Sequence, residues 1–170
     1  MAAGAQSAVL RDLQKAHGKL MDVSRYIIPR DDMAIAYTTA DAVDKKGVAI
    51  ARGSSVGFGV DEPIVKTLLT VRRFDPTIRS AACIRYEDDI LATAVETLRD
   101  VEVYDPEKFP VGISTMDWGI ASVCRKGVPL AIANPESSRG PGRICLLGAT
   151  PDEVANRILI ISQRLTYIDI

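Results

Sequence analysis

The sequence predicts a layered α/β domain whose sheet is covered by helices on both faces. Short apolar runs rich in β-branched residues alternate with amphipathic helical segments along the whole chain. No repeat, linker or low-complexity stretch interrupts this alternation, which is typical of a sheet packed between two helical layers. At 170 residues the chain is long enough for one domain with a sizeable core, so we expect residues 1–170 to form a single domain.

The first half of the chain predicts three helices and four strands. Apolar residues from Val9 to Met21 recur at helical spacing and predict a helix over about 5–24. A second helix follows Asp61, a plausible cap, and has Pro63 in its first turn, where proline is tolerated. The predicted elements are helix 5–24, strands 33–38 and 48–51, helix 62–73, strand 80–86, helix 88–99 and strand 101–104.

The second half continues the same alternation. A helix is predicted to open at Ser114 and to run to about Lys126. Apolar strands follow at 130–133 and 144–147, separated by a Pro/Ser/Gly/Arg loop. The last helix begins with a capping box in which Thr150 and Glu153 can satisfy each other's backbone donors. Its predicted buried stripe consists of Val154, Ile158, Ile161 and Leu165.

Composition excludes several classes of protein. Hydrophobic residues are 47% and charged residues 25%, which is typical of a globular protein rather than a disordered one. The formal net charge of -1 gives no overall field for nucleic acid, so we expect no direct nucleic-acid binding. The longest apolar runs are far shorter than the roughly 20 residues of a membrane helix. The amino terminus lacks a signal-peptide pattern, and we expect a cytoplasmic protein with no membrane contact.

The three cysteines predict no zinc site. Cys83, Cys124 and Cys145 are widely spaced in apolar contexts, and the only histidine is His17. A zinc site needs three or four protein ligands, usually with cysteine or histidine among them. A nucleophilic thiolate would need a base nearby, which one histidine could supply only if the fold brought it there. We therefore expect buried, inert thiols, in agreement with a cytoplasmic location.

Two arginines bracket the strand at 80–86 and are the leading candidates for anion binding. Arg79 follows a turn at Asp75–Pro76, and Arg85 lies at the far end of the strand. A planar guanidinium donates paired hydrogen bonds to a phosphate or a carboxylate. The alternative is ordinary ion pairing with the nearby acids Glu87, Asp88 and Asp89.

Three other segments could contribute to a site. The glycine-rich segment 53–59 could present backbone N–H groups to an anion, or it could be a tight strand connection. The predicted helix start at 114–119 offers Ser114, Thr115 and free N–H groups as an anion cradle, with Trp118 as core or pocket wall. The loop 134–143 carries Arg139 and Arg143, and loops of this length are either functional or mobile.

The chain resembles a known family, the archaeal thiamine-phosphate synthase domain. That domain usually follows a hydroxymethylpyrimidine kinase or a helix-turn-helix segment. The resemblance covers nearly the whole chain, with its blocks in family order and spacing. The blocks are Ile28-Pro29, Ile35-Ala36-Tyr37, Phe58-Gly59, Phe74-Asp75-Pro76 with Ile78-Arg79, Ile84-Arg85-Tyr86, Ser114-Thr115-Met116 with Trp118-Gly119, and Leu147-Gly148.

The resemblance implies a three-layer α/β/α fold with a mixed sheet, similar to class II aldolases and to the C-terminal domain of hydroxymethylpyrimidine kinase. It also implies a reaction in which hydroxymethylpyrimidine diphosphate and thiazole phosphate form thiamine phosphate and release pyrophosphate. In that reaction Arg79 and Arg85 would hold the diphosphate, Ser114 and Thr115 the second phosphate, and Trp118 would wall the aromatic rings. Arg139 and Arg143 would add phosphate contacts from their loop.

Several polar positions of the family pattern are changed. The family's histidine after Phe58-Gly59, and the arginine three positions later, are Pro63 and Lys66 in this sequence. Two family asparagines are Ala34 and Cys83, and the family's Gly-Lys-Glu-Pro block is replaced by Arg-Gly-Pro-Gly-Arg at 139–143. The scaffold is kept while polar site residues are lost, which favours a changed ligand or a loss of chemistry.

Two functions are therefore expected. The first is a module that binds a phosphorylated pyrimidine or thiazole ligand, or thiamine phosphate, with catalysis unresolved. The alternative is an active synthase, in which Lys66 and Arg85 are the catalytic candidates. No cofactor is certain, but magnesium could be held by Asp61, Asp75 or Asp117. The sequence leaves the oligomeric state open, a homodimer included, together with any DNA-binding or kinase partner.

Overall fold

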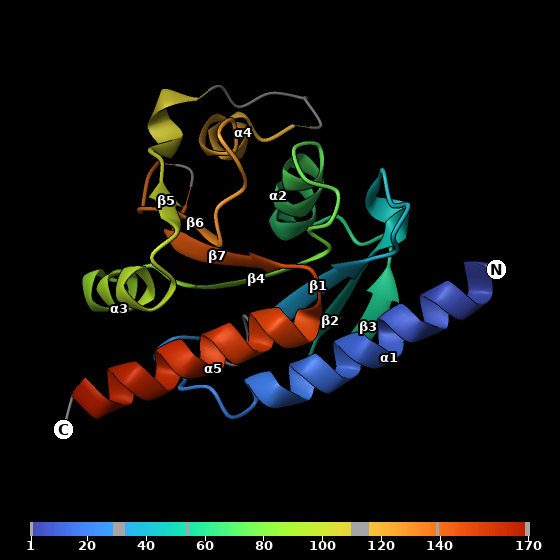
Figure 1. Cartoon of the computed structure of the whole chain (residues 1–170), viewed down its shortest axis with the longest axis horizontal. Helices are drawn as coiled ribbons and strands as arrows, with labels where there is room; N and C mark the ends of the chain where they lie inside the picture. Colours follow the sequence, from blue (N-terminus) through green and yellow to red (C-terminus); the bar gives the residue numbers. More distant parts are fainter. Residues whose placement is uncertain (1, 29–32, 54, 110–115, 139, 169–170) are drawn as a thin grey trace.

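The chain folds into three layers, with one sheet between two sets of helices (Figure 1). The computed structural model describes residues 2–28, 33–53, 55–109, 116–138 and 140–168. One face of the sheet is covered by α1 (Ala2–Leu20), α3 (Asp88–Leu98) and α5 (Pro151–Ile168). The opposite face is covered by α2 (Pro63–Arg72) and α4 (Trp118–Val123). The predicted three-layer α/β/α architecture is confirmed.

The seven strands form one mixed sheet in the order β3-β2-β1-β4-β7-β6-β5. Neighbours are antiparallel except β5 and β6, which run parallel. The longest pairing joins β4 to β7 at the centre of the sheet. The strands are β1 (Ala34–Thr38), β2 (Val48–Arg52), β3 (Ser55–Phe58), β4 (Ser80–Arg85), β5 (Val101–Val103), β6 (Ala131–Asn134) and β7 (Arg143–Gly148).

Alternation along each central strand builds two separate cores. In β1, Ile35 and Tyr37 join the core beneath α1 and α5, whereas Ala34 and Ala36 join the core beneath α2 and α4. All five residues of β1 are buried, because both faces of the sheet are covered. Small alanines on the central strands allow the helices to approach the sheet closely. Residues on both faces of the central strands therefore contribute to the cores.

Helix α5 begins with the predicted capping box, with one change of partner. The backbone N–H of Glu153 donates to Thr150 Oγ1 at 3.2 Å. The Glu153 carboxylate accepts from the backbone N–H of Ala149 at 3.0 Å rather than from that of Thr150. The predicted buried stripe is confirmed, because Val154, Ile158, Ile161 and Leu165 are all buried.

Segment 53–59 contains the strand connection that was one of the two alternatives expected from the sequence: Gly53 turns with φ of +59°, and β3 follows as an edge strand. One predicted element is corrected. Helix α4 begins at Trp118, so the predicted helix start at Ser114 is wrong. Asp117 caps this helix by accepting from the backbone N–H of Ile120, which explains why the helix begins there. Two short 3₁₀ turns, η2 (Lys45–Gly47) and η3 (Pro106–Lys108), were not predicted.

The cysteine prediction is corrected as well. Cys83 of β4 and Cys145 of β7 form a disulfide, whereas Cys124 is free and buried. The two cysteines are direct partners in the antiparallel register, with Cα atoms 4.1 Å apart. Directly opposed residues come close enough for a bridge, but the register of remote strands cannot be seen in the sequence. Because intracellular disulfides are uncommon outside hyperthermophiles, the cysteines no longer support the cytoplasmic prediction.

The side chain of Arg72, at the end of α2, joins α2 by hydrogen bonds to the turn before β4 and to the connection after β1. Its side chain is 8% exposed and donates to four backbone carbonyls. Two belong to the turn before β4, at Pro76 and Ile78, and two to the connection after β1, at Ala40 and Ala42. Burial lowers the pKa of this guanidinium below its ordinary value. A charged group held by carbonyls alone is structural rather than part of a site.

In the part of the chain that the structure describes, no helix is long and apolar enough to cross a membrane.

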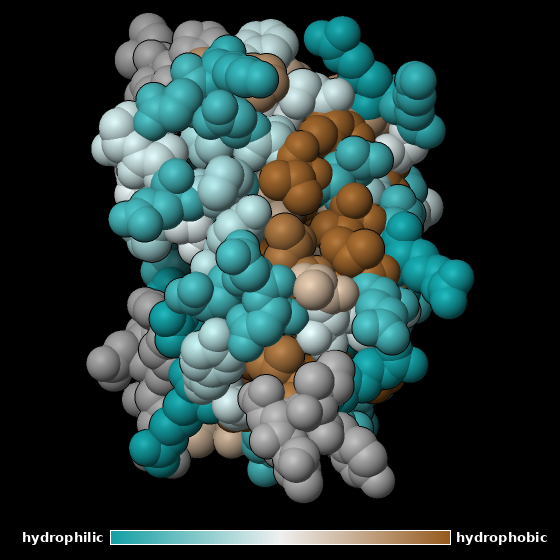
Figure 2. Space-filling view, turned by 90° about the vertical axis from the view of Figure 1, so that its left-hand side faces the viewer, coloured by the Kyte–Doolittle hydropathy of each residue, from teal (hydrophilic) through white to brown (hydrophobic). Residues whose placement is uncertain are grey.

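Figure 2 shows the side of the molecule on which α3 and β5 lie, where an apolar strip runs between polar side chains. Val95 of α3 and Val103 of β5 are among the exposed apolar residues. The homodimer left open by the sequence stays a prediction.

Candidate functional site

A cavity of about 600 Å³ lies beside the ends of several neighbouring strands of the sheet. The first residue of β1, the last residue of β2, the end of β4 and the start of β7 all line it. The start of α2, the connection from α1 to β1 and the loop before β7 complete the lining. We call this cavity the strand-end pocket. Its described lining contains three arginines and three glutamates: Arg52, Arg85, Arg143, Glu62, Glu87 and Glu136.

The cross-strand pair of Arg85 and Arg143 is the main polar feature of this pocket. Arg85 ends β4, Arg143 begins β7, and the two residues are direct partners in the antiparallel register. The disulfide between Cys83 and Cys145 lies two residues further along the same pair of strands, so all four side chains leave the same face. Like charges placed directly opposite each other are unfavourable in a sheet. An anion between them would relieve this repulsion.

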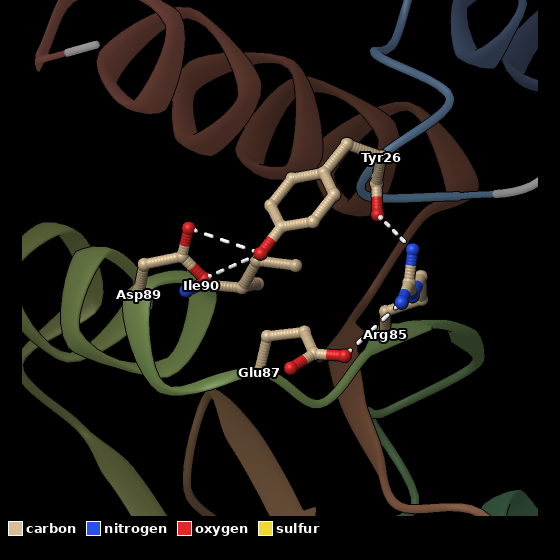
Figure 3. Close-up of polar contacts among 5 residues, drawn as sticks. All are labelled: Tyr26, Arg85, Glu87, Asp89 and Ile90. Carbon is tan, nitrogen blue, oxygen red and sulfur yellow. Dashed lines mark hydrogen bonds and ion pairs between the residues drawn. The ribbon is translucent and has the colours of Figure 1, made fainter.

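Arg85, which lines the pocket, is held by two neighbours (Figure 3). Its guanidinium forms an ion pair with Glu87 at 3.0 Å and donates to the carbonyl of Tyr26 at 3.3 Å. The guanidinium carbon also lies 5.2 Å from the centre of the Tyr26 ring. The ion pairing expected as the alternative role of Arg85 is thus present. Both members of the ion pair are about two-fifths exposed, so water screens it and an incoming anion can compete with Glu87.

Tyr26 is fixed in turn by Asp89 of α3. Its hydroxyl donates to the Asp89 carboxylate, with 2.9 and 3.1 Å to the two oxygens (Figure 3). This hydrogen bond to an anionic acceptor raises the pKa of Tyr26 above its ordinary value. Asp89 Oδ1 also accepts from the backbone N–H of Ile90, which holds the carboxylate against the first turn of the helix.

The other two arginines of the pocket have different partners. Arg143 donates to Thr67 Oγ1 at 3.0 Å, so its guanidinium lies beneath α2 and away from that of Arg85. Arg52 forms an ion pair with Glu62 at 2.9 Å, which joins the end of β2 to the start of α2. Before Arg143 the backbone is tightly packed: a Cβ added at Gly142 would lie 2.6 Å from the Asn134 carbonyl oxygen. The start of β7 therefore has little freedom to move.

The structure separates Arg79 from Arg85. Arg79 precedes β4 and Arg85 is its last residue, so the two are six residue steps apart along the strand, about 20 Å at the usual rise of a strand. Arg79 donates twice to the Thr38 carbonyl, at 3.1 and 2.8 Å, and lies over the Tyr37 ring at 4.7 Å. One ligand anion cannot bridge that distance, so the structure does not bring the two arginines together.

Other predicted site residues also lie away from the pocket. Lys66 of α2 and Trp118 of α4 are not among the described residues that line it. Trp118 is 49% exposed at the first position of α4. The backbone N–H of the neighbouring Asp117 donates to Thr70 Oγ1, near the end of α2 that lies away from the pocket. Ser114, Thr115 and Arg139 lie outside the described residues. Of the ligand-binding residues that the sequence predicts, the structure places Arg85 and Arg143 in one pocket.

The candidate magnesium ligands do not converge. Asp75 accepts from Thr77 within its own turn, and Asp117 caps α4. Asp61 is exposed, and its neighbour Glu62 is paired with Arg52. Among the described residues, no three His, Cys, Asp or Glu side chains form a group that could hold a metal ion. Any magnesium at the pocket would need oxygens from a ligand as well.

Arg52, Glu87 and Glu136 line the pocket but were not predicted from the sequence as site residues. Tyr26 was not predicted either; it is not among the described lining residues, but with Glu87 it holds Arg85. A signal for Arg52 was present, because a charged residue directly follows the apolar run of β2. No comparable signal identifies Tyr26 or Glu136, because their place depends on how the connecting segments fold back over the strand ends.

The chain matches a family model described as thiamine-phosphate synthase ThiN over residues 12–160. It is 28% identical over 140 residues to a bifunctional thiamine biosynthesis protein, ThiDN, from Methanocaldococcus jannaschii. That alignment covers 79% of this chain and 33% of the relative, so the chain spans about a third of that protein's length.

Two solved structures share the fold. The C-terminal domain of protein MJ0236 superimposes with a TM-score of 0.82 at 25% identity, covering 95% of this chain and 97% of that domain. The C-terminal domain of a phosphomethylpyrimidine kinase superimposes with a TM-score of 0.81 at 22% identity, covering 92% and 99%. The expected likeness to a hydroxymethylpyrimidine kinase C-terminal domain is confirmed, whereas the likeness to class II aldolases stays a prediction.

Proposed function

The chain belongs to the thiamine-phosphate synthase ThiN family, and from this membership we propose that its strand-end pocket binds a phosphorylated pyrimidine or thiazole ligand, or thiamine phosphate itself. The domain is thiamine-phosphate-synthase-like and has its place in thiamine biosynthesis. The proposal concerns the ligand class and its binding site.

The cross-strand pair of Arg85 and Arg143 carries this proposal. Two guanidiniums that start from opposed positions and line the same cavity can each donate to a different oxygen of one phosphate or diphosphate. Their present partners are a half-exposed carboxylate and a threonine hydroxyl, and both are weaker partners than a doubly charged phosphate. The anion would also reduce the repulsion between the two arginines.

The remaining lining suits a flat heterocycle. Ile27, Ile28, Ile64, Pro63 and Tyr86 give the pocket apolar and aromatic walls beside its charged groups. Ligand pockets commonly combine such walls with a few convergent polar groups, and about 600 Å³ lies in the usual size range. The three glutamates can accept hydrogen bonds from amino groups or balance a positive ring.

Catalysis is the second candidate function, supported by the family match over residues 12–160. Against it, the position that the family resemblance gives to a histidine is Pro63, which lines the pocket and has no group to transfer a proton. The chain's one histidine, His17, lies in α1 and is not among the described residues that line the pocket. Proton transfer at the pocket would therefore fall to Glu62, Glu87 or Glu136.

A binding measurement and a turnover assay test both candidates. Calorimetry with thiamine phosphate and with pyrophosphate, each with and without magnesium, should give saturable binding that Arg85→Ala weakens about tenfold to a hundredfold. Absence of binding to both compounds would overturn the proposal. Mixing the chain with hydroxymethylpyrimidine diphosphate, thiazole phosphate and magnesium then asks whether thiamine phosphate forms above the protein-free control. Formation would make the chain a synthase that works without the family histidine.

A further inference from the structure

We propose that Tyr26 is a positioning residue for the anion site, which holds the Arg85 guanidinium in place when Glu87 gives way to a ligand. This inference rests on the proposed function, since it concerns the residue that the ligand anion would meet. Three observations carry it: the two contacts of Tyr26 with Arg85, the anchoring of Tyr26 by Asp89, and the exposure of the ring.

Tyr26 contacts Arg85 without neutralising its charge. The Arg85 guanidinium lies over the ring at 5.2 Å and donates to the Tyr26 carbonyl at 3.3 Å. An aromatic face and a carbonyl oxygen attract a cation but carry no net charge. Glu87, by contrast, cancels the charge that a phosphate would need. When an anion replaces Glu87, the contacts with Tyr26 can persist, so Arg85 keeps its direction and its full positive charge.

The position of Tyr26 is itself fixed from two sides. Its hydroxyl donates to Asp89 in the first turn of α3, and the next residue, Ile27, accepts from the backbone N–H of Arg85 at 2.9 Å. The segment before β1 is therefore tied both to α3 and to the end of β4. Ile27 and Ile28 of the same segment line the pocket, so the tie also holds one of its apolar walls.

Packing in the core does not explain the position of the Tyr26 side chain. Tyr26 is 40% exposed, whereas its neighbours Ile27 and Ile28 are fully buried and supply the core packing of the segment. An exposed ring whose hydroxyl is bound and whose face lies against a guanidinium is better explained by that guanidinium (Figure 3). When the rotamers of a ligand-binding arginine are fixed before binding, less conformational entropy is lost on binding and the free-energy cost is lower.

The test measures pyrophosphate affinity by calorimetry in five variants: Arg85→Ala, Tyr26→Phe, Tyr26→Leu, Asp89→Asn and Asp88→Asn. Tyr26→Leu removes the ring and should weaken binding about threefold to fivefold, the size of an exposed cation–π contact. Tyr26→Phe and Asp89→Asn keep the ring, and each should cause a smaller loss. Asp88→Asn is the matched control, because it removes the same charge from the same helical turn but does not touch Tyr26; its affinity should equal that of the wild type.

A double variant decides whether Tyr26 acts through Arg85. In an Arg85→Ala background, Tyr26→Leu should cause no further loss of affinity, since the group that it positions is absent. An additive loss, or unchanged affinity in Tyr26→Leu alone, would overturn the positioning role. Unchanged affinity in Arg85→Ala, or no binding by the wild type, would instead overturn the proposed function. NMR relaxation of the Arg85 Nε–Hε group without ligand gives an independent readout: equal order in the wild type and Tyr26→Leu also overturns the role.

Discussion

Arg85 and Arg143 face each other across the central strand pair β4–β7, two residues beyond the disulfide that joins Cys83 to Cys145. Their backbones are therefore held together by the sheet and by a covalent link, whereas their guanidiniums diverge toward Glu87 and Thr67. The fold thus fixes two positive charges at the rim of one cavity.

Removing either pocket arginine should weaken the binding of phosphate-containing ligands. A hydrogen bond to a charged group contributes about 1.5–3 kcal/mol, so Arg85→Ala and Arg143→Ala should each raise the Kd for pyrophosphate about tenfold to a hundredfold. Titration calorimetry measures the loss, and the melting temperature shows that each variant is folded. Wild-type affinity in both variants would exclude the strand-end pocket as the anion site.

Arg79→Ala should lower the stability of the protein and leave its ligand affinity unchanged, in contrast to the pocket-arginine variants. Its side chain bonds the Thr38 carbonyl and lies over Tyr37, remote from the pocket, so its loss should lower the free energy of unfolding by about 1 kcal/mol. Pyrophosphate affinity should stay within experimental error of the wild type. Chemical denaturation and calorimetry separate the two effects. A loss of affinity equal to that of Arg85→Ala would restore Arg79 to the ligand-binding role that the sequence suggested.

Alkylation of the protein should detect one free cysteine and one disulfide. Cys124 is 1% exposed, and burial raises the pKa of its thiol to about 11, so the native protein should not react with iodoacetamide at pH 8. Unfolded without reductant, the chain should take up one alkyl group, and after reduction it should take up three. Intact mass spectrometry counts them. Three alkyl groups without reductant would show that the disulfide does not form in solution.

Tyr26 should titrate at a higher pH than an ordinary tyrosine. The hydrogen bond to Asp89 raises its pKa above 10.0, so the folded state retains the proton longer than the unfolded state. The stability that this bond contributes is complete below pH 10 and is lost as the pH rises through the raised pKa. The difference in absorbance at about 295 nm between the wild type and Tyr26→Phe isolates the transition. Asp89→Asn should shift it to lower pH, and an unchanged midpoint would contradict the contact.

Arg72→Leu should be the most destabilising of these changes. It would leave four inward-facing carbonyls without their shared donor, at Ala40, Ala42, Pro76 and Ile78. We expect the free energy of unfolding to fall by about 3 kcal/mol or more, because buried acceptors without partners are costly. Denaturation by urea measures the change. A loss below about 1 kcal/mol would mean that water replaces the guanidinium.

The periodic elements could be predicted from the sequence, because their signals are local. The stripe from Val154 to Leu165 and the cap at Thr150 depend only on residues a few positions apart. Strand β3 was missed because Gly53, Gly57 and Gly59 weaken its pattern, although the register with β2 stabilises it. The start of α4 was misplaced because Asp117, which was not predicted as a cap, caps the helix, so the helix begins at Trp118.

The site was predictable only in part, because its geometry depends on contacts between remote segments. Arg85 and Arg143 were named from their chemistry, but their pairing follows from the β4–β7 register. The same register brings Cys83 to Cys145, which are 62 positions apart. Tyr26 could not be identified, because its role arises where the segment before β1 crosses the end of β4.

The position of β7 in the chain has a consequence during synthesis. A ribosome makes β4 well before β7, so the growing chain carries Arg85 for a time with no strand on that side of β4. A product that ends within the 134–143 loop would lack β7 and α5, which supplies much of one core. Such a fragment would have half of the arginine pair and no disulfide partner for Cys83. Ligand affinity would then distinguish finished chains from interrupted ones in a translation mixture.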